Sequence, residues 1–213
     1  MDIYWYGQAF FKIKGKNTSI MIDPFYSDFT GLKLPKDMIA DIAIKTHNHK
    51  DHSNLEAVLG DPVKIEGPGE YEIKGVAVAG VSVFHDKENG AQRGKNTVYN
   101  INIDGLNIVH LGDLGHILTE SQIEDIGKTD ILMVPVGSIF TIDAKDAQEV
   151  VSQLEPQIII PMHYATSGLK FELEPVDKFL KEMGTENPEA LNKLTVTKDK
   201  LPAEPQIIVL NKS

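Results

Sequence analysis

The 213-residue chain contains no cysteine. Disulfides, thiolate zinc sites, iron–sulfur clusters and cysteine nucleophiles are therefore excluded, although the absence of thiols does not identify the compartment. Basic residues are also few, because 21 lysines and arginines stand against 31 aspartates and glutamates, for a net charge of −10. This balance argues against a general nucleic-acid-binding protein, which needs a basic face. It describes the whole surface and leaves the charge of any one cleft open.

Long apolar runs are absent as well. Ile158–Met162 is among the longest and contains a proline, so it is far shorter than the roughly 20 residues of a membrane span. The segment Met1–Gly15 has no basic stretch leading into an apolar one, which a secretory signal would show. We therefore expect a soluble, cytoplasmic protein without a membrane partner. The length favours a single domain over residues 1–213.

The pattern of apolar residues predicts strands first and an alternation of strands and helices later. The expected strands are 3–6, 9–14, 19–22, 41–45, 63–66, 71–74, 76–84, 96–103, 107–111, 130–135, 157–161 and 206–210. The expected helices are 54–59, with Ser53 as its cap, 120–126, 143–154 and 175–183. This order predicts sheet layers flanked by helices.

Three of the seven histidines fall within one short polar segment, His47-Asn48-His49-Lys50-Asp51-His52. In an extended loop, side chains two residues apart point the same way, so His47 and His49 can share one metal ion. Asp51 and His52 are then free to face a second ion. A solvated surface loop is the alternative interpretation of a histidine cluster by itself.

Three more potential ligands, His85, Asp113 and His163, each stand at or shortly after the end of an expected strand. Loops that leave several strands at one edge of a sheet can converge on one point. The resulting ligand set contains only nitrogen and oxygen, which suits zinc, manganese or iron and does not choose among them.

These residues form an ordered set: H-x-H-x-D-H at 47–52, followed by His85, Asp113 and His163. Together with Asp23 after an early strand, the set resembles the metallo-β-lactamase superfamily. Three further segments are similar to a small branch of uncharacterised hydrolases related to ascorbate-6-phosphate lactonases: HLGDLGH (110–116), PVGSIFTIDA (135–144) and IPMHYAT (160–166). The resemblance runs from about residue 1 to residue 166.

The resemblance implies an α/β (α+β) fold, a four-layer αββα sandwich with a two-metal site at one edge. By this analogy His47, His49 and His85 hold one ion, Asp51, His52 and His163 hold the other, and Asp113 bridges both. Two divalent ions per chain are expected, zinc first, with manganese or iron as alternatives. Asp23 would orient the ligand loop through hydrogen bonds; its alternative role is a turn cap before Pro24.

Two positions bear on how far the analogy extends. Relatives often carry a histidine in the first Gly-His turn, where this chain has Gln8, so the substrate cannot be copied over. Position 49 is histidine instead of the glutamate of the flavodiiron oxidase branch, which favours hydrolysis over oxygen chemistry. The lack of a thiolate ligand and of an export signal separates the chain from the cysteine-containing β-lactamases.

Several other residues have both a chemical and a structural interpretation. His116 could reach the cleft as a proton donor or be a surface histidine, whereas His110 is expected to be packed in its strand. Tyr164 could donate its hydroxyl to a developing oxyanion or be a core aromatic. Asp143 is expected to cap the helix that follows it, near the site.

The loop 85–95 carries Lys87, Arg93 and Lys95 directly after a potential ligand. Three cations on a mouth loop of an acidic protein could receive a phosphate or carboxylate group. A solvated hairpin is the alternative.

The resulting prediction is a binuclear metal-dependent hydrolase, in which hydroxide activated by both ions attacks an ester, lactone or phosphodiester bond. The predicted catalytic residues are Asp51, Asp113 and His116, and the expected partner is a small molecule, with a slight preference for one that bears phosphate or carboxylate. A metal-binding sensor without turnover and a mononuclear oxygen-using enzyme are the alternatives. Nucleic acid is not expected as a partner, and self-association, frequent in the superfamily, is left open.

Overall fold

The structure, a computed structural model, describes residues 1–185 and 188–213. Within these residues the strands form two sheets, with strand orders β12-β1-β2-β3-β4-β5 and β13-β11-β10-β9-β8-β7-β6. The first sheet contains β1 (Asp2–Trp5), β2 (Phe11–Lys14), β3 (Ser19–Ile22), β4 (Ile42–Ile44), β5 (Val63–Ile65) and β12 (Leu194–Thr195). The second contains β6 (Gly69–Ile73), β7 (Val76–Phe84), β8 (Lys95–Ile103), β9 (Leu106–His110), β10 (Ile131–Pro135), β11 (Ile158–Met162) and β13 (Gln206–Ile207). The helices are α1 (Ser27–Thr30), α2 (Glu120–Ile126), α3 (Ala144–Leu154) and α4 (Val176–Glu182).

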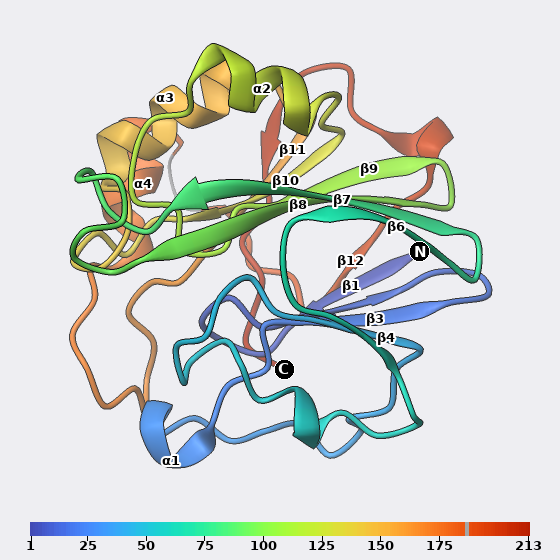
Figure 1. Ribbon diagram of the computed structural model, residues 1–213. Helices are drawn as coiled ribbons and strands as arrows, with labels where there is room; N and C mark the ends of the chain where they lie inside the picture. Colours follow the sequence, from blue (N-terminus) through green and yellow to red (C-terminus); the bar gives the residue numbers. More distant parts are fainter. Residues whose placement is uncertain (186–187) are drawn as a thin grey trace.

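The elements stack in layers, as predicted. Helices α2, α3 and α4 lie on the outer face of the second sheet, the two sheets face each other, and α1 lies beyond the first sheet (Figure 1). One large apolar cluster of buried side chains includes strand residues from both sheets. Every residue of β10 and β11 is buried, as expected for parallel strands covered on both faces. The predicted αββα architecture is confirmed.

The outer layer on the first sheet is thinner than the prediction. A second apolar cluster, which includes Phe10, Met21 and Phe25, is buried there under loops and the single turn of α1. The helix expected at 54–59 is only a three-residue 3₁₀ turn, Leu55–Ala57. Leu55 in this turn and Val58 directly after it are both buried, and residues three apart lie on the same side of one 3₁₀ turn.

Helix α3 follows directly from its sequence. The Asp143 side chain caps it by accepting a hydrogen bond from the backbone N–H of Asp146 at 2.9 Å, as predicted. The apolar residues on the buried face of this helix are Ala147, Val150, Val151 and Leu154. None of the described helices is long and apolar enough to cross a membrane.

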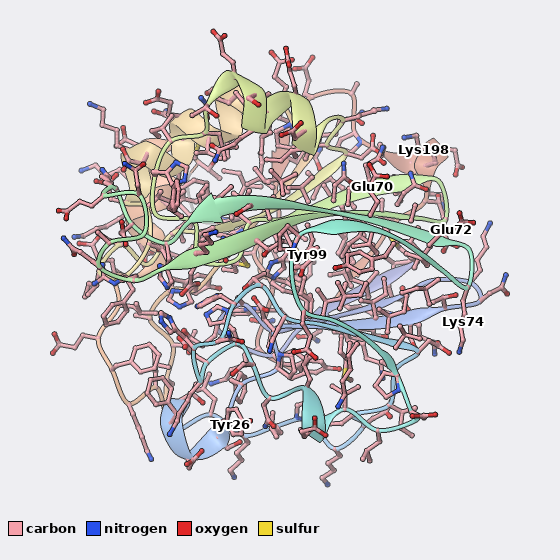
Figure 2. The ribbon with its side chains drawn as sticks, viewed as in Figure 1. Tyr26, Glu70, Glu72, Lys74, Tyr99 and Lys198 are labelled. Carbon is pink, nitrogen blue, oxygen red and sulfur yellow. The ribbon has the colours of Figure 1, made fainter. Side chains whose placement is uncertain are left out.

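Tyr99 of β8 connects the second sheet to loops of the first. Its hydroxyl lies 3.1 Å from the carbonyl oxygens of both Lys45 and Gly67, which follow β4 and β5 (Figure 2). The backbone immediately before the segment 47–52 is therefore held against the second sheet.

The last part of the chain, residues 191–213, is here called the C-terminal strap. Leu194 in β12 pairs with Ile3 at the edge of the first sheet, and Gln206 in β13 pairs with Ile158 at the edge of the second. The N–H of Ser213 also donates to the carbonyl oxygen of Trp5 at 2.9 Å. The two-residue strand β12 carries too few residues to show an alternating pattern, and the sequence did not predict it.

Candidate metal centre

The potential ligands lie on loops from both sheets. The segment 47–52 follows β4 of the first sheet, whereas His85, Asp113 and His163 follow β7, β9 and β11 of the second. Strand β7 is antiparallel to β8, which is antiparallel to β9, and β9, β10 and β11 are parallel. The carboxyl ends of β7, β9 and β11 therefore meet at one edge of the sheet, which is where side chains of an α/β protein commonly converge on a ligand.

These loops bring seven side chains into two groups. Within each group, one potential ligand atom from every residue lies within 4.8 Å of all the others. The first group consists of His47, His49 and His85, and the second of Asp51, His52, Asp113 and His163. For six of these residues the division is the one implied by the resemblance, whereas Asp113, the implied bridge, falls in the second group.

Asp113 faces both groups with one carboxylate oxygen. Its Oδ2 lies 3.1 Å from Nε2 of His85 in the first group and 3.2 Å from Nε2 of His52 in the second. Its Oδ1 lies 3.5 Å from Nε2 of His163. The Asp113 carboxylate therefore contacts histidines of both groups.

Several buried polar atoms of the second group have no hydrogen-bond partner within the described part of the chain, and a divalent cation would take its place. Among the described residues, Nε2 of His52, both ring nitrogens of His163 and Oδ1 of Asp113 are buried without a hydrogen-bond partner. Each such atom costs about 1–3 kcal/mol when nothing replaces its contact with water. A cation that accepts nitrogen and oxygen ligands would compensate Nε2 of His52, one ring nitrogen of His163 and Oδ1 of Asp113 at once.

Asp23, at the end of β3, orients histidines in both groups. This buried carboxylate accepts hydrogen bonds from the backbone N–H and the Oγ1 hydroxyl of Thr46, both at 2.7 Å, and from Nδ1 of His52 at 2.8 Å. Because the hydroxyl of Thr46 donates to Asp23, it can accept from Nδ1 of His47, which is 3.0 Å away. In its neutral form each imidazole then carries its proton on Nδ1 and directs an Nε2 lone pair into the site. The structure thus supports the predicted orienting role of Asp23.

Burial and charge set the protonation of the groups. Burial and the neighbouring His52 lower the pKa of His47 to about 2, so this imidazole is neutral at ordinary pH. Burial also lowers the pKa of His49. Burial opposes charging of His52 as well, but the carboxylates of Asp113, Asp51 and Asp23 outweigh it and raise the pKa of His52. Three carboxylates around one buried imidazole create a negatively charged region that is stabilised by a positive charge beside it.

Two glycines let the ligand loops approach each other closely. A Cβ added to Gly115 would collide with the backbone of His85 and Asp86, and one added to Gly137 would collide with the carbonyl oxygen of His163. The loops that carry two of the potential ligands are therefore packed backbone to backbone, which leaves no space for a side chain.

A cavity of about 640 Å³ opens onto both groups. Its floor includes the buried His85, Asp51 and Asp113, and the exposed His49 also lines it. Its walls and mouth are lined by Phe29, Asn48, Lys50, Arg93, Phe140, Lys170 and Phe171. This volume lies within the range of small-molecule sites.

A family model described as a beta-lactamase superfamily domain matches residues 2–163. The chain belongs to this superfamily. A "UPF0173 metal-dependent hydrolase" of Thermoplasma acidophilum is 31% identical over 193 residues, covering 79% of this chain and 85% of the relative. A protein of the same designation from Methanosarcina mazei is 30% identical over 200 residues, covering 78% and 84%.

A solved structure of a Thermotoga maritima protein assigned to the metallo-β-lactamase superfamily is 38% identical to this superfamily member. It superimposes with a TM-score of 0.81 and covers 98% of this chain and 97% of its own. The predicted superfamily and fold are therefore confirmed.

The three predicted loop cations of this superfamily member do not all line the main cavity. Of the three predicted, Arg93 lines the main cavity, but Lys87 is paired with Asp146 at 2.6 Å. Lys95 lines another cavity, of about 350 Å³, which Arg93 also lines. Sequence reasoning missed Lys170, because no local pattern shows that the segment after His163 returns to line the cavity.

Asp86 also escaped prediction. Its side chain accepts hydrogen bonds from four backbone N–H groups of the loop that follows, with distances from 2.7 to 3.0 Å, those of Glu88, Gly90, Gln92 and Arg93. Burial raises the pKa of Asp86, but these donors outweigh it and lower the pKa to about 2. The signal was an aspartate at the start of a glycine-containing turn, which commonly binds backbone N–H groups further along.

The placement of His116 speaks against its predicted catalytic role. Its Nε2 accepts from the backbone N–H of Phe84 at 3.2 Å, and its Nδ1 donates to the carbonyl oxygen of Ile117 at 2.7 Å. Both ring nitrogens are thus used by the backbone. His116 is also not among the residues that line the main cavity, so it is poorly placed to protonate a leaving group there.

Tyr164 and His110 have structural surroundings. Tyr164 is buried and its ring centroid lies 4.9 Å from that of Trp5, which agrees with the core-aromatic interpretation. His110 is fully buried, donates from Nε2 to the carbonyl oxygen of Ala9 at 2.9 Å and accepts at Nδ1 from the N–H of Gly112 at 3.1 Å. It is the packed strand histidine that the sequence predicts.

Gln8 contributes to the centre through its backbone. Its carbonyl oxygen accepts hydrogen bonds from the N–H of His163 at 3.0 Å and from Nε1 of Trp5 at 2.8 Å. The residue is fully buried with φ of +51°. It therefore supports a ligand-bearing loop, and it is not among the residues that line the main cavity.

Proposed function

We propose that the chain is a metal-dependent hydrolase with two divalent ions, acting on an ester, lactone or phosphodiester bond of a small molecule. The observation that carries the proposal is the Asp113 carboxylate, whose one oxygen lies within 3.2 Å of histidines from both groups at the floor of a cavity. The names of the curated relatives, metal-dependent hydrolases, support the same class.

The side chains divide the work of holding the ions. His47, His49 and His85 would hold one ion, and Asp51, His52 and His163 the other, with Asp113 shared. We propose zinc for both positions, with manganese or iron as the alternatives. When bound, two such ions lower the pKa of coordinated water and withdraw charge from the bond to be broken.

The protein's own contribution is positioning. The Asp23–Thr46 pair binds Nδ1 of His52 and of His47 and thereby turns Nε2 of each ring toward the centre, so that a cation has only to displace the proton that the neighbouring carboxylates favour on His52. The floor residues Asp51 and His85 leave one side of the centre open to the cavity. A substrate can therefore reach both positions from the same side.

The first experiment measures the metal content of the purified protein together with hydrolysis of a generic ester, a lactone and a phosphodiester. We expect about two ions per chain and turnover that is lost on chelation and restored by metal. Asp113→Asn should lower the metal content and abolish turnover. Asp130→Asn is the matched control, because Asp130 is also buried but lies outside both groups.

The other outcomes discriminate among the alternatives. Two ions without turnover of any substrate would favour a metal-binding sensor, and a single iron per chain would favour an oxygen-using enzyme. Failure to take up zinc, manganese or iron, or full turnover by Asp113→Asn, would contradict the proposal.

A further inference from the structure

Three phenylalanines form one wall of the main cavity. Phe29 comes from α1, Phe140 from the loop before α3, and Phe171 from the loop after β11. The ring centroids of Phe29 and Phe171 are 5.7 Å apart, and those of Phe140 and Phe171 are 5.9 Å apart. Such distances are those of aromatic side chains in contact. Phe29 is nevertheless 43% exposed, so part of this apolar wall is open to a ligand.

The wall is held in place by the segments that carry it. The backbone N–H of Lys170 donates to the carbonyl oxygen of Thr30 at 2.9 Å, and its Nζ donates to that of Asp28 at 2.7 Å. These bonds fasten the loop of Phe171 to α1, which carries Phe29. A preformed aromatic wall loses little conformational entropy when a ligand binds.

Arg93 stands beside this wall. Its guanidinium lies 5.3 Å from the centre of the Phe140 ring, and its backbone N–H is held by Asp86 at 2.7 Å. Among the described residues it forms no ion pair, whereas Lys87 of the same loop is paired with Asp146. A partly buried guanidinium without a carboxylate partner is suited to hold a carboxylate, sulfonate or phosphate group of a ligand.

The charge of the cavity mouth is opposite to that of the protein. Lys50 and Lys170 join Arg93 among the lining residues, and the acidic lining residues, Asp51 and Asp113, both belong to the metal groups. The whole chain carries a net charge of −10. A cationic mouth on an acidic protein concentrates anions at that point of the surface.

We propose that the cavity binds a small anion that carries an aromatic ring, with Arg93 holding the anionic group and the phenylalanine wall contacting the ring. The inference rests on the proposed hydrolase function and names its substrate class. Neither feature is accounted for by the metal groups alone, because these need no apolar wall and no cation.

The direct test is calorimetric titration of the metal-loaded protein with naphthalene-2-sulfonate, whose sulfonate is a weak metal ligand. We expect binding of this aromatic anion, weaker binding of the uncharged 2-naphthalenemethanol, and no detectable binding of methanesulfonate. Arg93→Gln should lower the affinity for the aromatic anion about tenfold and change the affinity for the uncharged compound by less than about twofold. Lys87→Gln is the control, a cation of the same loop outside the cavity. Phe171→Ala should weaken both aromatic compounds.

Equal affinities for charged and uncharged rings, or equal effects of Arg93→Gln and Lys87→Gln, would overturn the proposal. A kinetic comparison separates it from the proposed function. Equal kcat/KM for neutral and carboxylate-bearing phenyl esters, unchanged in Arg93→Gln, would keep the hydrolase and overturn the substrate class. Absence of all turnover with the expected binding pattern would overturn the hydrolase and keep the ligand class.

Discussion

Replacement of Asp23 by asparagine tests how the two metal groups are oriented. Asparagine has nearly the same shape, and its oxygen can still accept the backbone N–H of Thr46, which Asp23 binds at 2.7 Å. Its NH₂ group must then face the Thr46 hydroxyl and Nδ1 of His52. Because an amide N–H donates, Nδ1 of His52 would have to accept, and the ring proton would move to Nε2, the atom that faces Asp113 at 3.2 Å.

The expected loss of metal affinity depends on whether Asp23 contacts the histidine directly or through Thr46. His52 is bound to Asp23 directly at 2.8 Å, so the affinity of the second group should fall about 10- to 100-fold, or about 1.4–2.7 kcal/mol. His47 is connected only through the Thr46 hydroxyl, so the first group should lose less than about tenfold. The unequal loss is the signature of an orienting role.

The assay is competition with a chelator of known affinity on metal-free protein, resolved into two binding steps. Asp41→Asn provides a matched control, because Asp41 also accepts a backbone N–H and a hydroxyl from one residue, Ser19, both at 2.9 Å. It contacts no histidine in either group. Two wild-type affinities in Asp23→Asn, or an equal loss in Asp41→Asn, would refute the reasoning.

Three further predictions concern residues around the centre and in the fold. Gly137→Ala should destabilise the protein by about 1–3 kcal/mol, because the new Cβ collides with the His163 carbonyl. Thermal melting should show a lower melting temperature and metal titration a lower affinity. An unchanged metal affinity would contradict the packing argument. Asp130→Asn should cost about 1–3 kcal/mol at pH 7, and the cost should shrink as pH falls below 3.8. Burial raises the pKa of Asp130, but its hydrogen bonds outweigh burial and lower the pKa, so the Asp130 carboxylate stabilises the protein above its pKa in the unfolded chain and loses this effect as the pH falls through its pKa in the folded protein. Denaturation of the metal-free protein at pH 7 and pH 3 checks this, with the exposed Asp125→Asn as control. A cost of Asp130→Asn that does not change with pH would refute the argument. His116→Gln should lower stability by about 1 kcal/mol and leave kcat unchanged; a large loss of kcat in a folded variant would restore its catalytic role.

The fold was predictable wherever a local pattern carried it. The fully apolar runs of β10 and β11 and the capped amphipathic α3 show their structure within about ten residues of sequence. The helix at 54–59 was wrong, since two buried residues three apart satisfy a 3₁₀ turn as well as an α-helix. The strap strand β12 exists only because β1 offers it an edge, which no local pattern reveals.

The candidate site likewise combines features that local sequence patterns predict with features that depend on contacts between distant residues. The metal-ligand spacing in 47–52 is local, and the other ligands stand at or shortly after the ends of strands that the sequence predicts. The relay through Thr46 depends on a contact across 23 residues, between Asp23 and Thr46. The wall of Phe29, Phe140 and Phe171 joins segments separated by more than a hundred residues, and only the folded chain brings such side chains together.

The C-terminal strap has a mechanical consequence for the centre. Four of the potential ligands follow the first sheet, in the segment 47–52, and three follow the second sheet, namely His85, Asp113 and His163. Any sliding of one sheet over the other would stretch or compress the gap that Asp113 spans. Because β12 and β13 pair the strap with the edges of both sheets, the strap resists such shear from a position outside the metal centre. Loosening it should therefore detune the spacing of the centre before it unfolds the protein.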